Sequence, residues 1–165
     1  MDSKEITYLG DTIMNCNYEE MLLKVKGITD DIPYKIANLA NISAILFEDM
    51  ENINWAGFYL VEDGQLVLAP FQGKSACIKI KKGRGVCGTA WEEDKLQLVK
   101  NVHEFPGHIA CDCASNSEIV IPLHKGNEVV GVLDIDSFEL SNFNEDDAKG
   151  LQAIVDYMES KNIWM

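Results

Sequence analysis

The segment 129–136, VVGVLDID, constrains the fold of this chain more than any other. Its first five residues are apolar on both faces of a strand, which is typical of a central strand covered on both sides. A second apolar run, 118–123, precedes it, and Lys125-Gly126-Asn127 lies between the two. We therefore expect two neighbouring strands, the second inside a sheet that carries a layer on each face.

Other strands are predicted from aromatic and β-branched runs. Segments 53–61 and 65–71 flank Glu62-Asp63-Gly64, and Asp-Gly between such runs is a strong hairpin signal. Shorter strands are expected at 76–80 and 96–99. The hairpin pattern favours an antiparallel sheet.

Helices are predicted at both ends of the chain. The first follows a cap at Asn15 or Asn17, and the second spans the apolar residues of 36–47. The last begins after Asn144, where Glu145 and two aspartates suit the positive end of a helix. Because helices and hairpin strands are segregated, we expect an α+β fold with 1–165 as a single domain.

Composition limits the classes of partner. The chain has 14 Lys and Arg against 27 Asp and Glu, a net charge of −13, which argues against nucleic acid and anionic membranes. No apolar run approaches the about 20 residues of a membrane span, and the N-terminus lacks a signal-peptide pattern. An odd count of five cysteines without a secretory signal favours a reducing compartment, so we expect a cytoplasmic protein.

The glycine motif at 83–88, GRGVCG, matches a dinucleotide fingerprint, but the following helix, 86–93, is short and no long βαβ unit follows. We expect these glycines to permit a tight turn and close packing of the helix. Cys87 lies near the helix start, where the helix dipole should favour a thiolate and lower its pKa.

A loop at 101–117 shows no periodicity, and loops of this length are usually functional. It carries His103, His108, Cys111 and Cys113, whose spacing is a poor match to zinc sites, so we expect no metal there and hydrogen bonding by the histidines. The adjacent Asp112 should raise the pKa of Cys111.

Three acids are predicted to converge. Asp134 and Asp136 are two apart at a strand end, on one face, and Glu118 begins the strand before them. If the strands pair, the carboxylates meet where the core borders a cavity, and clustering raises at least one pKa. Solvation of a strand end is the alternative. Trp55 and Tyr59 also share a face, as core residues or as a pocket wall.

These blocks together resemble the free methionine-(R)-sulfoxide reductases, small enzymes built on a single GAF domain. The resemblance rests on NWAGFYL (54–60), ACIKI (76–80), GRGVCGTA (83–90), HIACD (108–112), SEIVIPL (117–123) and VVGVLDIDS (129–137), and it spans about 17–160. It implies a GAF-like fold: a mostly antiparallel sheet with the N- and C-terminal helices on one face, and the short helix and long loop on the other.

The resemblance also implies residue roles. Cys111 corresponds to the nucleophile, Cys77 to its disulfide partner and Cys87 to an auxiliary resolving thiol. The substrate-pocket positions of the family match Trp55, Tyr59, Glu118, Asp134 and Asp136. Cys113 departs from the family pattern and leaves the resolving thiol open, whereas Cys16 is expected to be structural.

The implied activity is reduction of free L-methionine-(R)-sulfoxide through a sulfenic acid and a disulfide. It implies no bound cofactor and regeneration by thioredoxin, itself reduced by NADPH and thioredoxin reductase. A non-catalytic GAF sensor of small molecules is the alternative, and a zinc-stabilised interaction module is a third. The terminal helices could pair within the chain or form a homodimer.

Overall fold

The computed structural model describes residues 16–107 and 114–164. Their helices are α1 (Tyr18–Thr29), α2 (Lys35–Asp49), α3 (Gly85–Glu93) and α4 (Glu145–Ser160), with a short 3-10 helix at Val102–Glu104. Their strands are β1 (Ile53–Glu62), β2 (Gln65–Gly73), β3 (Lys79–Ile80), β4 (Gln97–Val99), β5 (Ser117–Lys125) and β6 (Glu128–Ser137).

The strands form one sheet in the order β3-β2-β1-β6-β5-β4, and every neighbouring pair is antiparallel. The predicted hairpins β1–β2 and β5–β6 are both present, and β6 lies inside the sheet between β1 and β5. The prediction of an α+β fold with a covered central strand is therefore confirmed.

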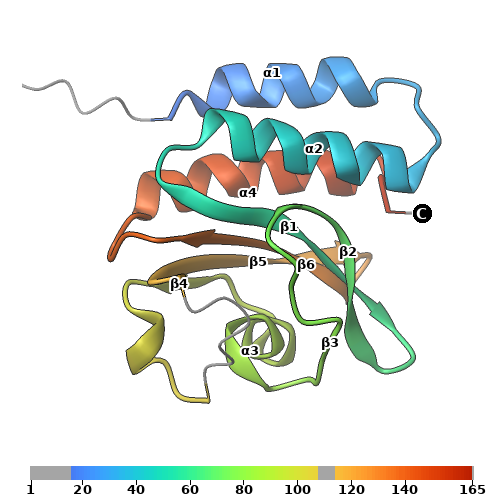
Figure 1. Cartoon of the computed structure of the whole chain (residues 1–165). Coiled ribbons are helices and arrows are strands. Elements are labelled where there is room, and N and C mark those ends of the chain that lie inside the picture. The colour runs from blue at the N-terminus through green and yellow to red at the C-terminus, as the bar shows by residue number, and fades with distance from the viewer. Residues whose placement is uncertain (1–15, 108–113, 165) are drawn as a thin grey trace, which may run out of the picture.

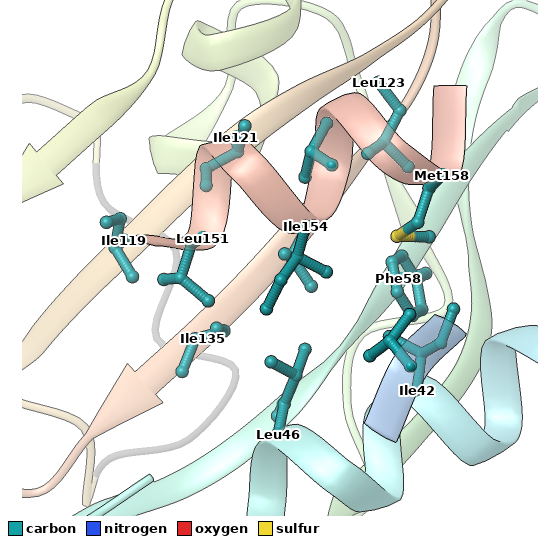
Figure 2. Packing of buried hydrophobic residues seen from close by; sticks show 14 of the residues in the cluster. Ile42, Leu46, Phe58, Ile119, Ile121, Leu123, Ile135, Leu151, Ile154 and Met158 are labelled. Carbon is teal, nitrogen blue, oxygen red and sulfur yellow. The ribbon is translucent and has the colours of Figure 1, made fainter. Parts of the chain in front are cut away.

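Two layers cover the sheet (Figure 1). Helices α1, α2 and α4 stack on one face, whereas α3 lies on the other, against β5 and β6. Figure 2 shows the first interface, where Ile42, Leu46 and Ile154 of the helices meet Phe58 and Ile135 of the sheet. Because side chains alternate along a strand, Leu133 and Ile135 enter this core while Val132 and Asp134 point toward α3.

The helix starts follow the predicted caps. Asn17 accepts a hydrogen bond from the Glu20 amide at 3.1 Å and begins α1. Asn144 and Asp147 form a reciprocal capping box at the start of α4, with bonds of 2.8 and 3.1 Å. None of the helices among the described residues is long and apolar enough to cross a membrane.

The glycine motif serves the turn before α3, as predicted. Gly83 and Gly85 have φ values of 75° and 61°, a region that favours glycine. A Cβ on Gly88 would lie 2.5 Å from the carbonyl oxygen of Lys81, so only glycine lets the helix approach this closely. These glycines therefore place α3 tightly over the sheet.

The strand predicted at 76–80 is shorter than expected. Only Lys79–Ile80 pairs with β2 as a strand, and Cys77 lies before it. The Tyr59 hydroxyl donates a hydrogen bond of 2.9 Å to the Cys77 carbonyl oxygen. The Tyr59 side chain thus binds the Cys77 carbonyl, and Cys77 lies before β3, outside the strand ladder and outside the described lining of the pocket between α3 and the sheet.

Candidate active site

A pocket opens between α3 and the sheet face opposite the three-helix layer. It encloses about 560 Å³ of empty space, a volume that includes open solvent at its mouth. Its lining includes six of the residues singled out from the sequence: Trp55, Tyr59, Cys87, Glu118, Asp134 and Asp136. Ser75, Ala76, Ile80, Arg84, Gly85, Val86 and Ser115 complete it.

The three acids converge because of strand register. Glu118 is the Cα partner of Asp136 across β5–β6, and Asp134 pairs with Val120 two residues along. Glu118 is 7% exposed and Asp134 is 6% exposed, so both carboxyls are buried and are not solvated strand ends.

Cys87, Glu118 and Asp134, hereafter the acid–thiol cluster, lie together in the lining of the pocket. One ligand atom from each lies within 4.8 Å of the other two, and the Cys87 Sγ is 3.8 Å from Glu118 Oε1. Burial and the charges of Asp134 and Asp136 hold the pKa of Glu118 well above its usual value. Burial also raises the pKa of Asp134, to about 6. The pair therefore keeps a proton to higher pH than ordinary carboxyls do, and that proton can be donated.

The expected low pKa of Cys87 is wrong. Burial raises the pKa of this thiol well above its usual value, and the negative charges of Asp134 and Glu118 raise it further. The dipole of a nine-residue helix is outweighed by complete burial beside two carboxyls. Cys87 is thus a protonated thiol at neutral pH.

Two aromatic rings form the wall of the pocket. Trp55 stacks on Phe71 at 5.1 Å and on Tyr59 at 5.9 Å between ring centroids, and its Nε1 donates to the Lys74 carbonyl oxygen at 3.1 Å. Both Trp55 and Tyr59 are nearly fully buried and also line the pocket, so they are core residues and pocket wall at once.

Gly57 is a structural determinant that the sequence reasoning missed. It lies between Trp55 and Tyr59 on β1 and pairs with Asp134 across β1–β6. A Cβ there would lie 2.8 Å from Trp55 Cη2 and 2.3 Å from Phe71 Cβ. The missing side chain is what admits the indole ring. A glycine inside an aromatic strand was the available signal.

Polar lining residues were missed as well. Ser115 lies near the end of the 101–117 segment and accepts a hydrogen bond of 3.0 Å from the Asn54 side-chain amide. Arg84, between the two glycines of the turn, is the single Lys or Arg among the described lining residues. A cation inside a glycine-rich turn was the signal that could have identified it.

The cysteines fall into different environments. Cys77 is disulfide-bonded, whereas Cys16 and Cys87 are free thiols. The half-buried Cys16 lies against the helix-side core with its Sγ 3.4 Å from the Asp49 carbonyl oxygen, in keeping with the expected structural role. Cys111 and Cys113 lie outside the described residues, so the predicted nucleophile stays a prediction.

Of the two histidines predicted in the long loop, the structure describes His103 alone. The exposed His103 side chain forms a hydrogen bond of 2.9 Å with Asn116 Oδ1, which is the hydrogen-bonding role expected for it. His108 lies outside the described residues, and so does most of the zinc set considered there.

The chain is similar to known proteins over most of its length. Residues 37–160 match the family model described as GAF domain. The chain is 56% identical over 124 residues to the free methionine-R-sulfoxide reductase of Escherichia coli strain K12, covering 75% of each protein. It is 40% identical over 144 residues to the reductase of the same name from Saccharomyces cerevisiae, covering 82% of this chain and 80% of that protein.

Solved structures of proteins from the same family have a similar fold. The structure of fRMsr of Staphylococcus aureus in complex with substrate superposes with a TM-score of 0.86 at 43% identity, covering 94% of this chain and all of that one. The free methionine-R-sulfoxide reductase of Neisseria meningitidis, in complex with its substrate, gives a TM-score of 0.85 at 43% identity and covers 89% of each chain.

The fold and the pocket thus define a GAF-domain protein whose described site joins two buried acids to one cysteine thiol. Within that class, the chain belongs to the family of free methionine-R-sulfoxide reductases, oxidoreductases that act on sulfoxides.

Proposed function

We propose that the chain reduces free L-methionine-(R)-sulfoxide to methionine with Cys111 as the nucleophile. The observation that carries the proposal is the buried Glu118–Asp134 pair inside a small aromatic-walled pocket. A sulfoxide sulfur is electrophilic when its oxygen is protonated or strongly hydrogen-bonded, and the raised pKa values of this pair let it hold a proton to higher pH than ordinary carboxyls do. Structures of relatives at 43% identity are complexes with substrate, which supports the same substrate class here.

The first chemical step transfers the sulfoxide oxygen from the substrate sulfur to the Cys111 sulfur. The Cys111 thiolate attacks the sulfoxide sulfur while the acid pair protonates the sulfoxide oxygen. The attack forms a transient bond between the two sulfur atoms. The hydroxyl group then passes to the Cys111 sulfur as the S–S bond and the substrate S–O bond break, methionine leaves with the electron pair, and Cys111 becomes a sulfenic acid. Sulfur of the substrate is reduced by two electrons and the cysteine is oxidised by two.

A second thiol then resolves the sulfenic acid with loss of water. Cys77 is our first candidate, because it is disulfide-bonded while Cys16 and Cys87 are free thiols. Cys113 stays the competing candidate for reaction with Cys111. Cys87 is less suited to the first resolving step, because its raised pKa leaves little thiolate to attack. A thioredoxin dithiol would reduce the resulting disulfide by exchange.

The pocket also suits a free amino acid. Asp136 and the ionised member of the acid pair can hold an α-ammonium group, which a methionine inside a protein lacks. The Trp55 ring can pack on the S-methyl group, a favourable sulfur–aromatic contact. We therefore expect preference for the free substrate over an N-blocked one.

An NADPH-coupled thioredoxin assay tests the function. It compares free methionine-(R)-sulfoxide, free methionine-(S)-sulfoxide and N-acetylmethionine sulfoxide with fully reduced protein. We expect turnover of the free R epimer alone. Binding of the R epimer without turnover would instead favour the non-catalytic GAF sensor, and equal turnover of free and blocked substrate would refute the ammonium argument.

A further inference from the structure

The acid–thiol cluster presents the donor set of a divalent metal site. Cys87 comes from α3, Glu118 from β5 and Asp134 from β6, and their ligand atoms lie within 4.8 Å of one another. One thiolate with two carboxylates suits a borderline cation such as Zn²⁺. Donors on one tetrahedral Zn²⁺ stand about 3.3–3.8 Å apart, so the cluster needs to contract by only about 1 Å.

An unsatisfied atom points to a ligand at the same place. Among the described residues, Asp134 Oδ1 is one of three buried side-chain polar atoms without a hydrogen-bond partner. Asp134 is 6% exposed and lines the pocket. A buried carboxylate oxygen without a partner is destabilising, and a bound cation would offset that cost.

The surroundings of the cluster favour reversible binding of a cation. The pocket opens to solvent, so three protein ligands would leave a fourth position for water, as in metal sites that exchange ligands. Asp136 adds a third carboxylate to the lining, and the whole chain carries a net charge of −13, which raises the local concentration of cations.

We propose that Zn²⁺ binds Cys87, Glu118 and Asp134 in the pocket and thereby inhibits the enzyme reversibly. Binding of the metal ties up the oxygen atoms of the acid pair, so no proton is left for the sulfoxide oxygen. The inhibition rests on the proposed function, whereas the binding site does not.

Binding is tested first without any activity readout. The probe is Co²⁺, titrated into a full-length C77S/C111S/C113S variant, in which Cys16 and Cys87 are the remaining thiols. We expect one equivalent to bind with a sulfur-to-cobalt charge-transfer band that added Zn²⁺ abolishes. The further substitution C87S should remove the band, whereas C16S, which removes a free thiol outside the pocket, should keep it.

The carboxylate ligands are tested in the same background. D134N or E118Q should weaken Zn²⁺ binding at least about tenfold, since even outer-shell changes cost that much. A band that survives C87S, or an affinity unchanged by both D134N and E118Q, would overturn the site. If the triple variant does not fold, the same titration is made on the oxidised wild type, where Cys77 is disulfide-bonded.

Inhibition is tested by single turnover, without thioredoxin, whose own thiols bind zinc. Reduced wild-type protein is loaded with one equivalent of Zn²⁺, and methionine formed from free methionine-(R)-sulfoxide is measured before and after chelation by EDTA. We expect at least a tenfold slower reaction, fully restored by EDTA. Unchanged turnover at full zinc occupancy would refute inhibition. A protein that is inactive even without zinc would refute the proposed function, and the Co²⁺ titration would then decide whether the metal site exists.

Discussion

Glu118 and Asp136 face each other as partners across the β5–β6 ladder, and Asp134 lies two residues along on the same side of the sheet. This register brings three carboxyls to one end of a hairpin and buries two of them under α3. The proton held by the pair, rather than the sum of surface charge, is what the proposed chemistry uses.

The pH dependence of the chemical step tests the acid pair. Glu118 has a raised pKa, so it is protonated below that pKa and loses the proton as pH rises through it. We expect the single-turnover rate to fall on the alkaline side. D134N removes a charge and a hydrogen bond that both raise the pKa of Glu118, so the alkaline limb should move to lower pH.

The matched control is Glu128→Gln, an exposed acid at the other end of the same strand, β6. Its pH profile should coincide with that of the wild type. If the alkaline limb lies at the same pH in D134N and wild type, the acid pair is not the proton donor of the chemical step.

Burial of Asp134 should also make the free energy of unfolding depend on pH. The pKa of Asp134 rises from 3.8 to about 6 on folding, so its stabilising contribution is present below pH 3.8 and is lost as pH rises through about 6. Relative to wild type, D134N should therefore gain about 1–3 kcal/mol in free energy of unfolding between pH 4 and pH 7.5. Urea denaturation at both pH values measures this gain, and a difference that does not change with pH contradicts the expectation.

Gly57 should be intolerant of any side chain. The Cβ of Gly57→Ala would overlap Phe71 and the Trp55 ring, so the variant should lose about 1–3 kcal/mol in free energy of unfolding. The control is Gly27→Ala, in α1, where nothing lies within 4 Å of the new Cβ and helix propensity improves. Urea denaturation should show the first variant destabilised and the second stabilised. Equal stability of Gly57→Ala and wild type would mean that the aromatic wall adapts.

The resolving thiol is decided by substitution of the competing cysteines. We expect Cys77→Ser to stop thioredoxin-dependent turnover after one methionine per protein and Cys113→Ser to leave it running. Cys16→Ser, outside the pocket, is the control and should retain full turnover. The reverse pattern, with Cys113 essential and Cys77 dispensable, would make Cys113 the resolving thiol.

Local signals predicted much of this fold. The apolar run of 129–133 indicated a covered central strand, and the caps at Asn17 and Asn144 begin helices α1 and α4. The alternation of side chains was enough to place Asp134 and Asp136 on one face, and a hairpin was enough to bring Glu118 to them. Each of these features follows from side-chain alternation, a helix cap or a hairpin, which can be read directly from the sequence.

Features that depend on distant residues were not predicted. The raised pKa of Cys87 follows from burial against carboxyls of other elements, which a helix-start position does not reveal. The shortened strand near Cys77 follows from a hydrogen bond with Tyr59, 18 residues away in the chain. The need for glycine at position 57 follows from Phe71 on a neighbouring strand.

The most direct test of the central claim is one turnover without any reductant. Fully reduced protein is mixed with excess free methionine-(R)-sulfoxide, and methionine, free thiols and disulfide-linked peptides are measured. We predict one methionine per chain, the loss of two thiols and a peptide pair joining Cys111 to Cys77, with no methionine from the Cys111→Ser variant. Absence of methionine from the wild type, or undiminished formation by Cys111→Ser, would contradict the proposed chemistry.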